Sequence, residues 1–578
     1  MASISSHPSF SSLLSFSASF SIPSMFPTSQ KPCQPSKPKR GRHASKVACN
    51  GNPNPRNRRD ILIGLGGLYG ATTLSGNSTG SAFGAPVSPP DPTNCVPPLL
   101  PGENDVNCCP PSPIVDFEFP SHKRLRHRRP AQWVDDDYLN KYKEAVRLMR
   151  ALPLDDPRNF MQQAKIHCAY CHNGYRQKGF PDHNLQVHGN WLFAPFHRWY
   201  LYFHERILGS LIGDPTFALP FWNWDNPPGM AMPAIYTDEN SPLYDPFRNA
   251  LHQPPVIVDL ANEANILDPS KQIVNNEITM FRHVVIEGIS PSLFLGKPYY
   301  AGCEPNNPGA GSLEKGPHNN VHRWTGDPTQ PHRIDMGYLA WAARDPIFFA
   351  HHSNVDRIWN IWKTIPGGFR RDFNDDDWLE SSFLFYDENK NLVRVKIKDC
   401  LDSRKLGYDY EYVDDTPWLN VRPRPKYAVP LPLPFPLPQP LPFPLTLNSI
   451  QRTTVKRPKK EESWSEVEKA EVLVMEVEYD MTKDVKFDVF INDQGDDEIG
   501  PEDSEFAGSF MTLAHSHGHQ SKRTTTSLRL AITDLLKDLH ALDDESIAVT
   551  LAPRYGNKPV TIKGIKIKLV PLVEYVNV

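Results

Sequence analysis

Two groups of three histidines are the residues of this sequence whose types and spacing suggest chemistry. Neither group has a carboxylate at ligand spacing, so each offers only neutral imidazole nitrogens to a metal ion. All-imidazole ligation suits copper, which cycles between Cu(I) and Cu(II), better than zinc or iron. The sequence therefore predicts a pair of similar copper sites. The groups are His167, His188 and His197, and His318, His322 and His352.

The first group is expected on two helices and the loop between them. His167 lies in residues 161–171 and His197 in residues 193–208, an aromatic-rich amphipathic stretch that should bury one face. His188 lies between them in a polar segment with glycine and proline, which favours a loop. These three elements would converge on one ion.

The second group is expected on two further helices. His318 and His322 stand at i and i+4 directly after a Gly-Pro pair, a favourable helix start, so both can reach one ion. Residues 346–362 predict a separate helix that brings the third ligand. Periodicity alone does not choose between His352 and the adjacent His351.

The composition favours a small-molecule partner. With 578 residues, of which 39% are hydrophobic, the chain is long enough for two folded units and extra segments. Its 62 Lys and Arg nearly balance 66 Asp and Glu, for a net charge of −4. Such a balance gives no field that would attract nucleic acid or an acidic membrane surface.

The N-terminal residues are typical of a targeting segment. Residues 1–59 are rich in serine, proline and basic residues and have no acidic residue, as in plastid transit peptides. The pair Arg58-Arg59 then precedes apolar residues 61–74, which are fewer than the ~20 that a spanning helix needs. We expect a bipartite signal, residues 1–86, that directs a mature chain without an integral membrane segment to the chloroplast thylakoid lumen.

Five of the nine cysteines crowd the start of the expected mature chain and the first histidine group. They are Cys95, Cys108, Cys109, Cys168 and Cys171. Residues 87–113 are rich in proline and have little core of their own, so disulfides to the histidine region would keep this segment attached. Cys303 and Cys400 have no obvious partner and are expected to be buried thiols, although they could pair.

The C-terminal part predicts a linker followed by a β-rich domain. Proline alternates with Leu or Phe within residues 422–445, which forbids a sheet interior and favours an extended linker. The basic run 456–460 is expected to be an exposed site of proteolysis. Short β-rich runs then follow one another, as in a β-sandwich or barrel. They are residues 472–479, 485–491, 506–513, 547–551 and 560–572.

Four segments around the six histidines resemble plant polyphenol oxidases, the catechol oxidase and tyrosinase family. They are residues 167–171 (HCAYC), 188 with 191–200 (WLFAPFHRWY), 318–322 (HNNVH) and 345–357 (DPIFFAHHSNVDR). The resemblance covers nearly the whole chain. It implies a mainly α catalytic domain with a four-helix bundle around a dinuclear copper site, and a C-terminal all-β sandwich-like domain. The targeting segment, catalytic domain, Pro-rich and basic linker, and shielding domain are expected at residues 1–86, 87–415, 416–468 and 469–578.

The resemblance also implies covalent and metal-binding roles. The first histidine group would hold copper A and the second copper B. A thioether would join Cys171 to His188 and fix that loop ligand. Two disulfides are implied, Cys95 with Cys109 and Cys108 with Cys168.

By the same resemblance the chain is a latent enzyme that oxidises o-diphenols to o-quinones and reduces O2 to water, with monophenol hydroxylation left open. Glu314 and Asn319 would position a water that takes the proton of a monophenol. Leu339, where many relatives have phenylalanine, and Arg323 at the pocket mouth would tune the choice of substrate. An aromatic pocket for a planar phenol, or else plain core, is expected at Trp191, Phe196, Phe348 and Phe349.

Two alternative functions stay open at this point. A specialised phenolic hydroxylase of secondary metabolism is permitted by the same residues. A haemocyanin-like O2 carrier would use the same copper pair, although plastid targeting argues against it. A zinc peptidase is disfavoured, because His204-Glu205 lacks the second histidine of that motif. No role is assigned to five further histidines, His172, His204, His515, His517 and His519.

Overall fold

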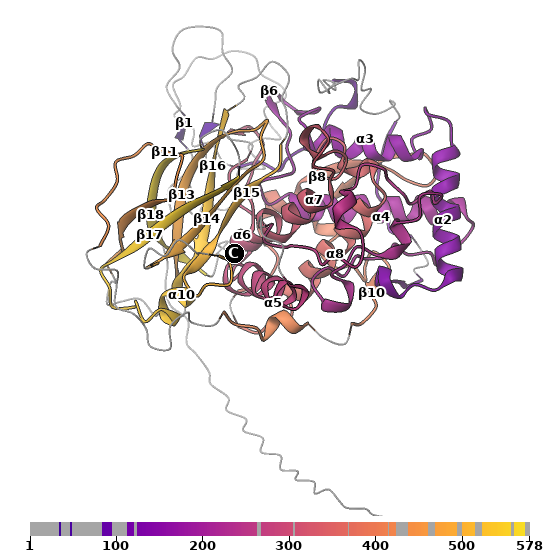
Figure 1. Ribbon diagram of the computed structural model, residues 1–578. Coiled ribbons are helices and arrows are strands. Elements are labelled where there is room, and N and C mark those ends of the chain that lie inside the picture. The colour runs from indigo at the N-terminus through magenta and orange to yellow at the C-terminus, as the bar shows by residue number, and fades with distance from the viewer. Residues whose placement is uncertain are drawn as a thin grey trace, which may run out of the picture. The chain divides into compact units, whose positions relative to one another are not determined.

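The computed structural model describes most of the chain from residue 84 onward (Figure 1). The described residues are 84–94, 113–120, 124–262, 268–304, 307–367, 369–413, 416–423, 437–459, 469–493, 500–514, 523–555 and 560–572, with the short strands β1 (Gln34–Pro35) and β2 (Val47–Ala48). Most of the expected targeting segment lies outside them. The helices and larger sheets belong to one compact unit that includes Gly84–Val578.

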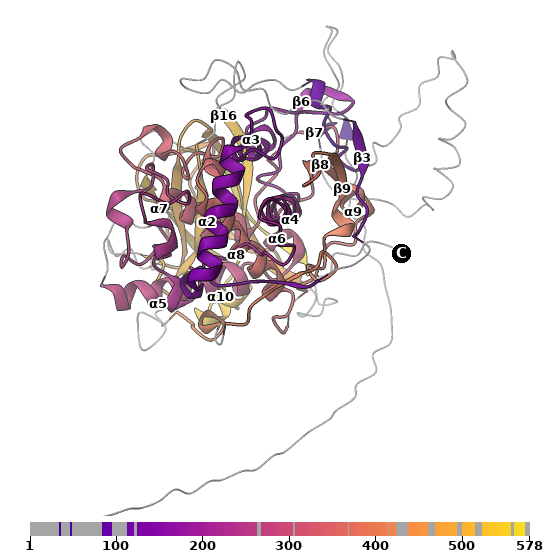
Figure 2. The ribbon, with the colours of Figure 1, turned by 90° about the vertical axis from the view of Figure 1, so that its right-hand side faces the viewer.

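The region between residues 124 and 423 is mainly helical. Its α-helices are α2 (Asp136–Ala151), α3 (Phe160–Cys171), α4 (Phe193–Leu211), α5 (Pro269–Met280), α6 (Pro291–Phe294), α7 (Asn319–Thr325), α8 (Ile347–Trp362) and α9 (Asp376–Glu380). Asp135, Asn159 and Asp268 cap α2, α3 and α5 by accepting a first-turn N–H. Helix α4 lies centrally and contacts α2 and α8 (Figure 2). The helices expected around His167, His197 and His352 are confirmed.

Small sheets accompany these helices. Strands β3 (Ile114–Asp116), β9 (Leu392–Lys396) and β8 (Ser382–Tyr386) form one, and β10 (Tyr408–Tyr410) pairs in parallel with β4 (Arg126–Arg128). Strands β5 (Arg176–Gln177) and β6 (Phe180–Asn184) pair just before the loop of His188, and β7 (Cys303–Glu304) pairs with β2. Within the described ranges, no helix is long and apolar enough to cross a membrane.

Segments of π-helix modify the second half of the helical region. The segment η7 (Phe281–Ile286) continues α5, and η8 (Glu314–His318) runs directly into α7. A Cβ on Gly316 would lie 2.6 Å from Nδ1 of His283, so this position needs glycine. The backbone of Gly316 is non-helical, so the helix that carries His318 and His322 starts at the Gly-Pro pair as expected, whereas the turn that precedes it from Glu314 was not predicted.

The C-terminal region consists of two four-stranded antiparallel sheets around one hydrophobic core, with strand orders β11-β18-β13-β16 and β12-β17-β14-β15. The elements are β11 (Leu445–Leu447), β12 (Gln451–Lys456), β13 (Lys469–Asp480), β14 (Val485–Ile491), β15 (Phe506–Thr512), β16 (Arg523–Ala531), α10 (Thr533–Asp538), β17 (Ser546–Tyr555) and β18 (Val560–Pro571). Alternate residues, such as Leu473, Met475 and Val477, face the core. The expected β-rich C-terminal region is confirmed.

This β-rich domain begins earlier than expected. Strands β11 and β12 lie within the expected linker 416–468, yet they pair with β18 and β17. Arg457, in the basic run expected to be exposed, has a side chain only 5% exposed that binds Glu471 at 2.6 Å. Its guanidinium also donates to three backbone carbonyls between residues 541 and 544. Lys456 and Lys459 of this run are exposed as expected, whereas Arg457 is not, because its partners come from distant parts of the sequence.

Candidate metal centre

The first histidine group lies where α3, α4 and the loop before α4 meet. His167 on α3, His197 on α4 and His188 in the loop are all buried. One ring nitrogen of each and the Sγ atom of Cys171 lie within 4.8 Å of one another. The side chain of Gln186 holds the loop, since its Oε1 accepts the backbone N–H of His188 at 3.0 Å. The structure thus brings the three predicted histidines together.

The second group joins three helical segments. His318 ends η8, His322 lies in α7, and His352 lies in α8 beside His351. Ring nitrogens of all four lie within 4.8 Å of one another, and the Nε2 atoms of His322 and His352 are 3.3 Å apart. Nδ1 of His351 accepts the indole N–H of Trp224 at 3.1 Å. The group therefore contains both histidines of the adjacent pair, one of which already has a protein partner.

The two groups face each other. The rings of His197 and His352 stack with centroids 4.1 Å apart and planes 10° apart. The ring centroids of His188 and His318 are 6.1 Å apart. Two metal ions held by adjoining groups can act together on one substrate.

Backbone carbonyls fix the orientation of several rings. A carbonyl oxygen lies 2.8 Å from Nδ1 in three pairs, His167 with Leu339, His197 with Phe193, and His322 with Met336. Because a carbonyl only accepts hydrogen bonds, Nδ1 carries the proton and Nε2 keeps its lone pair. Nε2 of His167, His197 and His318 is buried without a hydrogen-bond partner. Such an orphaned acceptor is what a metal ion satisfies.

Burial keeps these imidazoles neutral. It lowers the pKa of His197 to about 3 and that of His322 to about 4. Burial, aided by neighbouring histidines, also lowers the pKa values of His167, His318 and His352 well below the usual value. The neutral ring is the form that binds metal ions. Two adjoining groups of neutral nitrogen donors fit two copper ions.

The cysteines fall into three categories. Cys171 is a buried thiol close to His188, and burial raises the pKa of that thiol. Cys168 is buried, whereas the cysteines expected to form disulfides with it or with each other lie outside the described residues, namely Cys95, Cys108 and Cys109. Cys400 is a buried thiol as expected, but Cys303 is disulfide-bonded, so a free thiol is wrong there.

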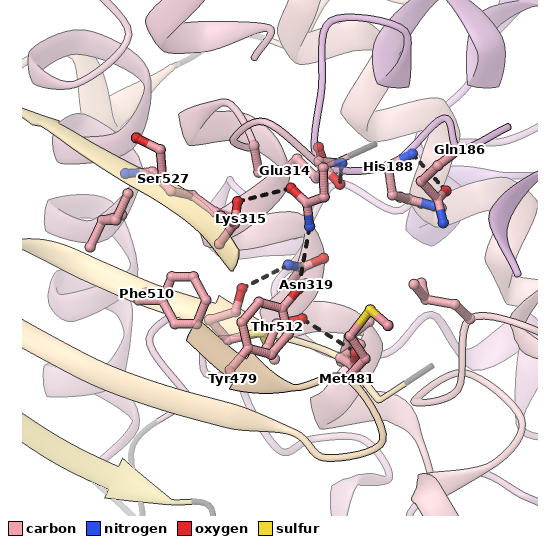
Figure 3. A pocket seen from close by; sticks show the side chains of 18 residues that line it. Gln186, His188, Glu314, Lys315, Asn319, Tyr479, Met481, Phe510, Thr512 and Ser527 are labelled. Atoms are coloured by element: carbon pink, nitrogen blue, oxygen red, sulfur yellow. Dashed lines mark hydrogen bonds between the residues drawn. The ribbon is translucent and has the colours of Figure 1, made fainter. Parts of the chain in front are cut away.

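A pocket adjoins the metal-binding residues and is lined from both the helical region and the β-rich domain (Figure 3). His188, Glu314 and Asn319 line it from the helical region. Tyr479 of β13 and Phe510 of β15 line the opposite side. The C-terminal domain therefore forms part of the wall of the cavity that a substrate would enter.

Glu314 and Asn319, the pair expected to position a water, both line this pocket. One carboxylate oxygen of Glu314 accepts the backbone N–H of Gly189 at 2.7 Å, and the other is buried without a hydrogen-bond partner. Burial raises the pKa of Glu314 to about 8. The Oδ1 atom of Asn319 lies 2.9 Å from Nδ1 of His318, and its Nδ2 donates to the carbonyl of Met511 at 3.2 Å. Glu314 thus has an acceptor available for a water or a substrate proton.

The two predicted gate residues both contact the β-rich domain. Leu339 is 5% exposed and packs in one apolar cluster with Met511 of β15. The Arg323 guanidinium binds the Asp484 carboxylate at 3.0 Å and lies 3.9 Å above the Tyr555 ring. The β-rich domain therefore covers much of both side chains, and that of Arg323 is 12% exposed.

The spare histidines near the first group are buried. His204 stacks on Phe349 with centroids 3.5 Å apart, and Nε2 of His172 lies 3.3 Å from the Tyr338 hydroxyl oxygen. Neither belongs to the two histidine groups. The three alternating histidines of the C-terminal region, His515, His517 and His519, lie outside the described residues.

The aromatic residues around the two groups are only partly those expected. Phe348 lies near His167 as expected, with ring centroids 4.8 Å apart. Trp191 instead packs against Trp378, away from both groups. The missed residue is Phe193, whose ring centroid is 4.6 Å from that of His318. Its position four residues before His197, on the same helical face, is the signal that could have found it.

The helical core with two adjoining all-histidine groups defines the tyrosinase class. Residues 157–365 match the family model for the common central domain of tyrosinase. Residues 372–424 match the polyphenol oxidase middle domain, and residues 443–569 match the chloroplastic polyphenol oxidase C-terminal domain. The last match, like strands β11 and β12, starts within the expected linker.

Close relatives cover nearly the whole chain. Polyphenol oxidase A1, chloroplastic, from Vicia faba is 51% identical over 96% of this chain and 97% of its own length. (+)-Larreatricin hydroxylase, chloroplastic, from Larrea tridentata is 48% identical over 97% and 99%. The structure of latent apple tyrosinase superposes with a TM-score of 0.75 and 52% identity, over 79% of this chain and 100% of that one. The chain belongs to the plant polyphenol oxidase family.

Proposed function

We propose that this protein oxidises o-diphenols to o-quinones with two bound copper ions, and that O2 is reduced to water. The observation that carries this function is the pair of adjoining buried histidine groups, with unpartnered Nε2 lone pairs, in a polyphenol oxidase chain. Two copper ions that each change by one electron match the two electrons that a catechol loses. Two catechols and one O2 thus give two quinones and two waters.

His167, His188 and His197 would hold copper A, and His318, His322 and His352 would hold copper B. For the second ion we choose His352 over His351, because Nδ1 of His351 already accepts the Trp224 N–H. The helices α3, α4, α7 and α8 would form a four-helix bundle around the two ions. In support, these helices and the adjoining η8 carry every ligand except His188.

The covalent links remain part of the proposal. A thioether between Cys171 and His188 is supported by their proximity in the first group, and it would stop the loop ligand from swinging away. Disulfides would pair Cys95 with Cys109 and Cys108 with Cys168. Peptide mapping of the mature protein by mass spectrometry, with and without reduction, tests all three links.

Glu314 and Asn319 would act on the substrate proton. The free oxygen of Glu314 can accept a proton from a phenol directly or through a water, and Asn319 would hold that water beside the second group. The Glu314 carboxyl must be ionised to do so. Ionisation is disfavoured by burial but favoured by nearby copper ions, whose positive charge stabilises the carboxylate.

We assign the β-rich domain the role of a shield that keeps the enzyme latent. The support is that it lines the pocket and contacts three residues of the copper B region, Asn319, Arg323 and Leu339. The catalytic domain would span residues 87–415. The cleavable tether would lie between residue 416 and the first strand β11, a shorter stretch than the 416–468 linker first expected. Removing the shield would open the pocket.

One experiment tests both the activity and the latency. The purified full chain is loaded with copper, and O2 consumption is measured with catechol, tyramine and a carboxylated phenol before and after proteolytic cutting of the tether. Quinone formation that increases after cutting is the expected result. Unchanged turnover after cutting would reject the shield, whereas reversible O2 binding without any quinone would favour a haemocyanin-like carrier.

The specialised phenolic hydroxylase is the second candidate function. The (+)-larreatricin hydroxylase relative, at 48% identity over 97% of the chain, supports it, and the same residues at the pocket permit it. A monophenol turned over far faster than catechol by the cut enzyme would favour this candidate.

The cellular location is supported by two observations. Relatives named chloroplastic support a chloroplast protein, and the twin-arginine segment supports the thylakoid lumen. Import into isolated chloroplasts followed by fractionation tests the lumen.

A further inference from the structure

Asn307 places a carboxamide in the pocket beside the first histidine group. The residue lies between β7 and η8 and lines the pocket together with His188 and Glu314. Its carboxamide lies directly against Gly189, since a Cβ on that glycine would be 2.1 Å from Oδ1 of Asn307. Gly189 follows His188 in the sequence, so the amide lies next to the loop that carries a candidate copper ligand.

Backbone hydrogen bonds within the helical region hold the segment of Asn307 in place. The N–H of Gly309 donates to the carbonyl of Gly189 at 2.9 Å, and the N–H of Lys297 donates to the carbonyl of Gly309 at 2.9 Å. Gly189 has a φ of +73°, which glycine adopts without strain, and it has no side chain to displace the amide. None of these contacts involves the β-rich domain.

Hydroxyl groups of the β-rich domain occupy both ends of the Asn307 amide. Its Nδ2 donates to the Tyr479 hydroxyl at 3.3 Å, and its Oδ1 accepts from the Thr526 hydroxyl at 3.0 Å. Tyr479 lies on β13 and Thr526 on β16. A hydroxyl suits either end of a carboxamide, because it both donates and accepts. Removal of the β-rich domain would therefore leave a donor and an acceptor to be satisfied in the pocket.

The other two carboxamides that line this pocket differ from Asn307. Both ends of the Gln186 amide bind backbone groups of the helical region. The Oδ1 atom of Asn319 lies 2.9 Å from Nδ1 of His318, and its Nδ2 donates to the β-rich domain. Among the residues that line the pocket, Asn307 is thus the carboxamide that would lose a partner at each end.

The distance between Asn307 and Glu314 suits a substituted phenol. Oε1 of Glu314 lies 2.7 Å from the backbone nitrogen of Gly189, and the Asn307 amide contacts the same residue. Across the bonds of Gly189, these contacts place the amide within roughly 8 Å of the Glu314 carboxylate. A phenol whose ring hydroxyl lies at Glu314 can therefore direct a short ring substituent to Asn307.

We propose that Asn307 selects among the substrates of the cut enzyme, because its carboxamide binds a hydroxyl group on the ring substituent of the phenol. That hydroxyl takes the place of the Tyr479 and Thr526 hydroxyls in the uncut chain. Catechols whose substituent has a hydroxyl are favoured over catechols with an alkyl substituent of the same length. This selection rests on the proposed oxidation of o-diphenols and on the proposed shield.

Two catechols that differ by one hydroxyl test this role, ethylcatechol and hydroxyethylcatechol, each substituted para to a ring hydroxyl. KM and kcat are measured for both with the copper-loaded enzyme after the tether is cut. Asn307→Leu keeps nearly the same size without the amide. It should raise the KM for hydroxyethylcatechol about three- to tenfold, as expected for one lost hydrogen bond, and leave its kcat and the KM for ethylcatechol within about twofold.

Two further variants serve as controls for the size of the new side chain. Asn307→Ala, which removes the amide without adding bulk, should give the same selective rise in KM. Asn240→Leu, at an exposed asparagine of the helical region, should change neither KM. A rise in Asn307→Leu without a rise in Asn307→Ala would assign the effect to bulk and overturn the selection.

The uncut chain gives a separate measure of the docking contacts. Asn307→Leu removes two hydrogen bonds to the β-rich domain, so the fraction of uncut chains with an open pocket, and hence their turnover, should rise severalfold. Thr526→Val removes one of these bonds and should raise the turnover of the uncut chain less. After cutting, Thr526→Val should show the same two KM values as the unmodified enzyme, because only the β-rich domain is altered.

The outcomes separate this selection from the function on which it rests. An equal rise of both KM values in Asn307→Leu would mean that the residue only shapes the pocket, and two unchanged KM values would mean that it does not contact the substrate. Either result overturns the selection while the proposed function stands. If the unmodified cut enzyme forms no quinone from either catechol, the proposed function fails and the selection fails with it.

Discussion

The two histidine groups differ in what surrounds them. The first group is held by α3, α4 and a loop, and its fixed neighbours, such as Gln186 and Cys171, belong to the helical region. The second group is flanked by Asn319 and Arg323, which contact Met511 and the Asp484 carboxylate of the β-rich domain. The ligand-holding contacts of the first group thus lie mainly within the helical region, whereas residues beside the second group bind the β-rich domain directly. We infer that the residues around copper B determine when a substrate can enter and which substrate is accepted.

The largest expected effect separates the adjacent histidines of the second group. His352→Gln should remove one copper ion per chain and lower catechol turnover by more than about 10³-fold, because a group at the reacting atoms is lost. His351→Gln should retain both ions, since Trp224 already occupies its Nδ1. Copper analysis and O2 consumption after cutting the tether measure both effects. Loss of copper from His351→Gln alone would reverse the assignment.

Much of the centre could be predicted because its signals are local. The i and i+4 spacing of His318 and His322, and the amphipathic stretches around His197 and His352, directly predict which side chains share a helical face. The π-helical turn that precedes this helix was not predicted, since the close approach of Gly316 to the distant ring of His283 leaves no local signal in the sequence.

The β-rich domain was harder to delimit for the same physical reason. Strands β11 and β12 are defined by pairing with β18 and β17, about a hundred residues later, and Arg457 is buried by partners that no local pattern reveals. The contacts of Met511 and Asp484 with the copper B side are likewise long-range. A local sequence pattern indicates that a domain exists. The residues at which the domain begins, and its contacts with the helical region, depend on residues far away in the sequence.

A second prediction concerns Glu314, which links the two groups by accepting the N–H of Gly189 next to His188. Its folded pKa, about 8, is raised above the usual value of 4.5, so the copper-free folded state binds more protons between these values and loses stability as pH rises. Between pH 5 and pH 8 the free energy of unfolding of the copper-free chain should therefore fall by about 4 kcal/mol because of this carboxyl, and Glu314→Gln should remove that fall.

Urea unfolding of the copper-free chain at several pH values measures how the free energy of unfolding changes with pH. Glu144→Gln is the control, because the exposed Glu144 side chain contributes little to stability. If the free energy of unfolding of Glu314→Gln depends on pH as it does in the unmodified chain, the Glu314 carboxyl does not cause the loss of stability.

A third prediction tests the internal support of the first group. Cys171→Ser would remove the proposed thioether, free His188 to move, and weaken copper A about tenfold while leaving copper B unchanged. The copper content that remains after treatment with a chelator measures the weakening. Mass spectrometry of the peptide that contains His188 shows whether the thioether is absent. Cys400→Ser, at a buried thiol outside both groups, should retain both ions. Equal loss of both ions from Cys171→Ser would mean that the two groups share one support.

The smallest effect is expected at Arg323, which lies beside the second histidine group and binds the β-rich domain. While the domains are in contact, Asp484 neutralises Arg323, so its charge is available to substrates only after the β-rich domain is removed. In the cut enzyme, Arg323→Gln should therefore raise the KM for a carboxylated phenol about two- to fivefold and leave the KM for catechol unchanged, as expected for one partly screened charge. Arg147→Gln, at an exposed arginine on α2, is the control for a general change in net charge. A similar rise for both phenols would mean that Arg323 shapes the pocket instead of selecting by charge, and substrate choice would then rest with Leu339 and the pocket walls.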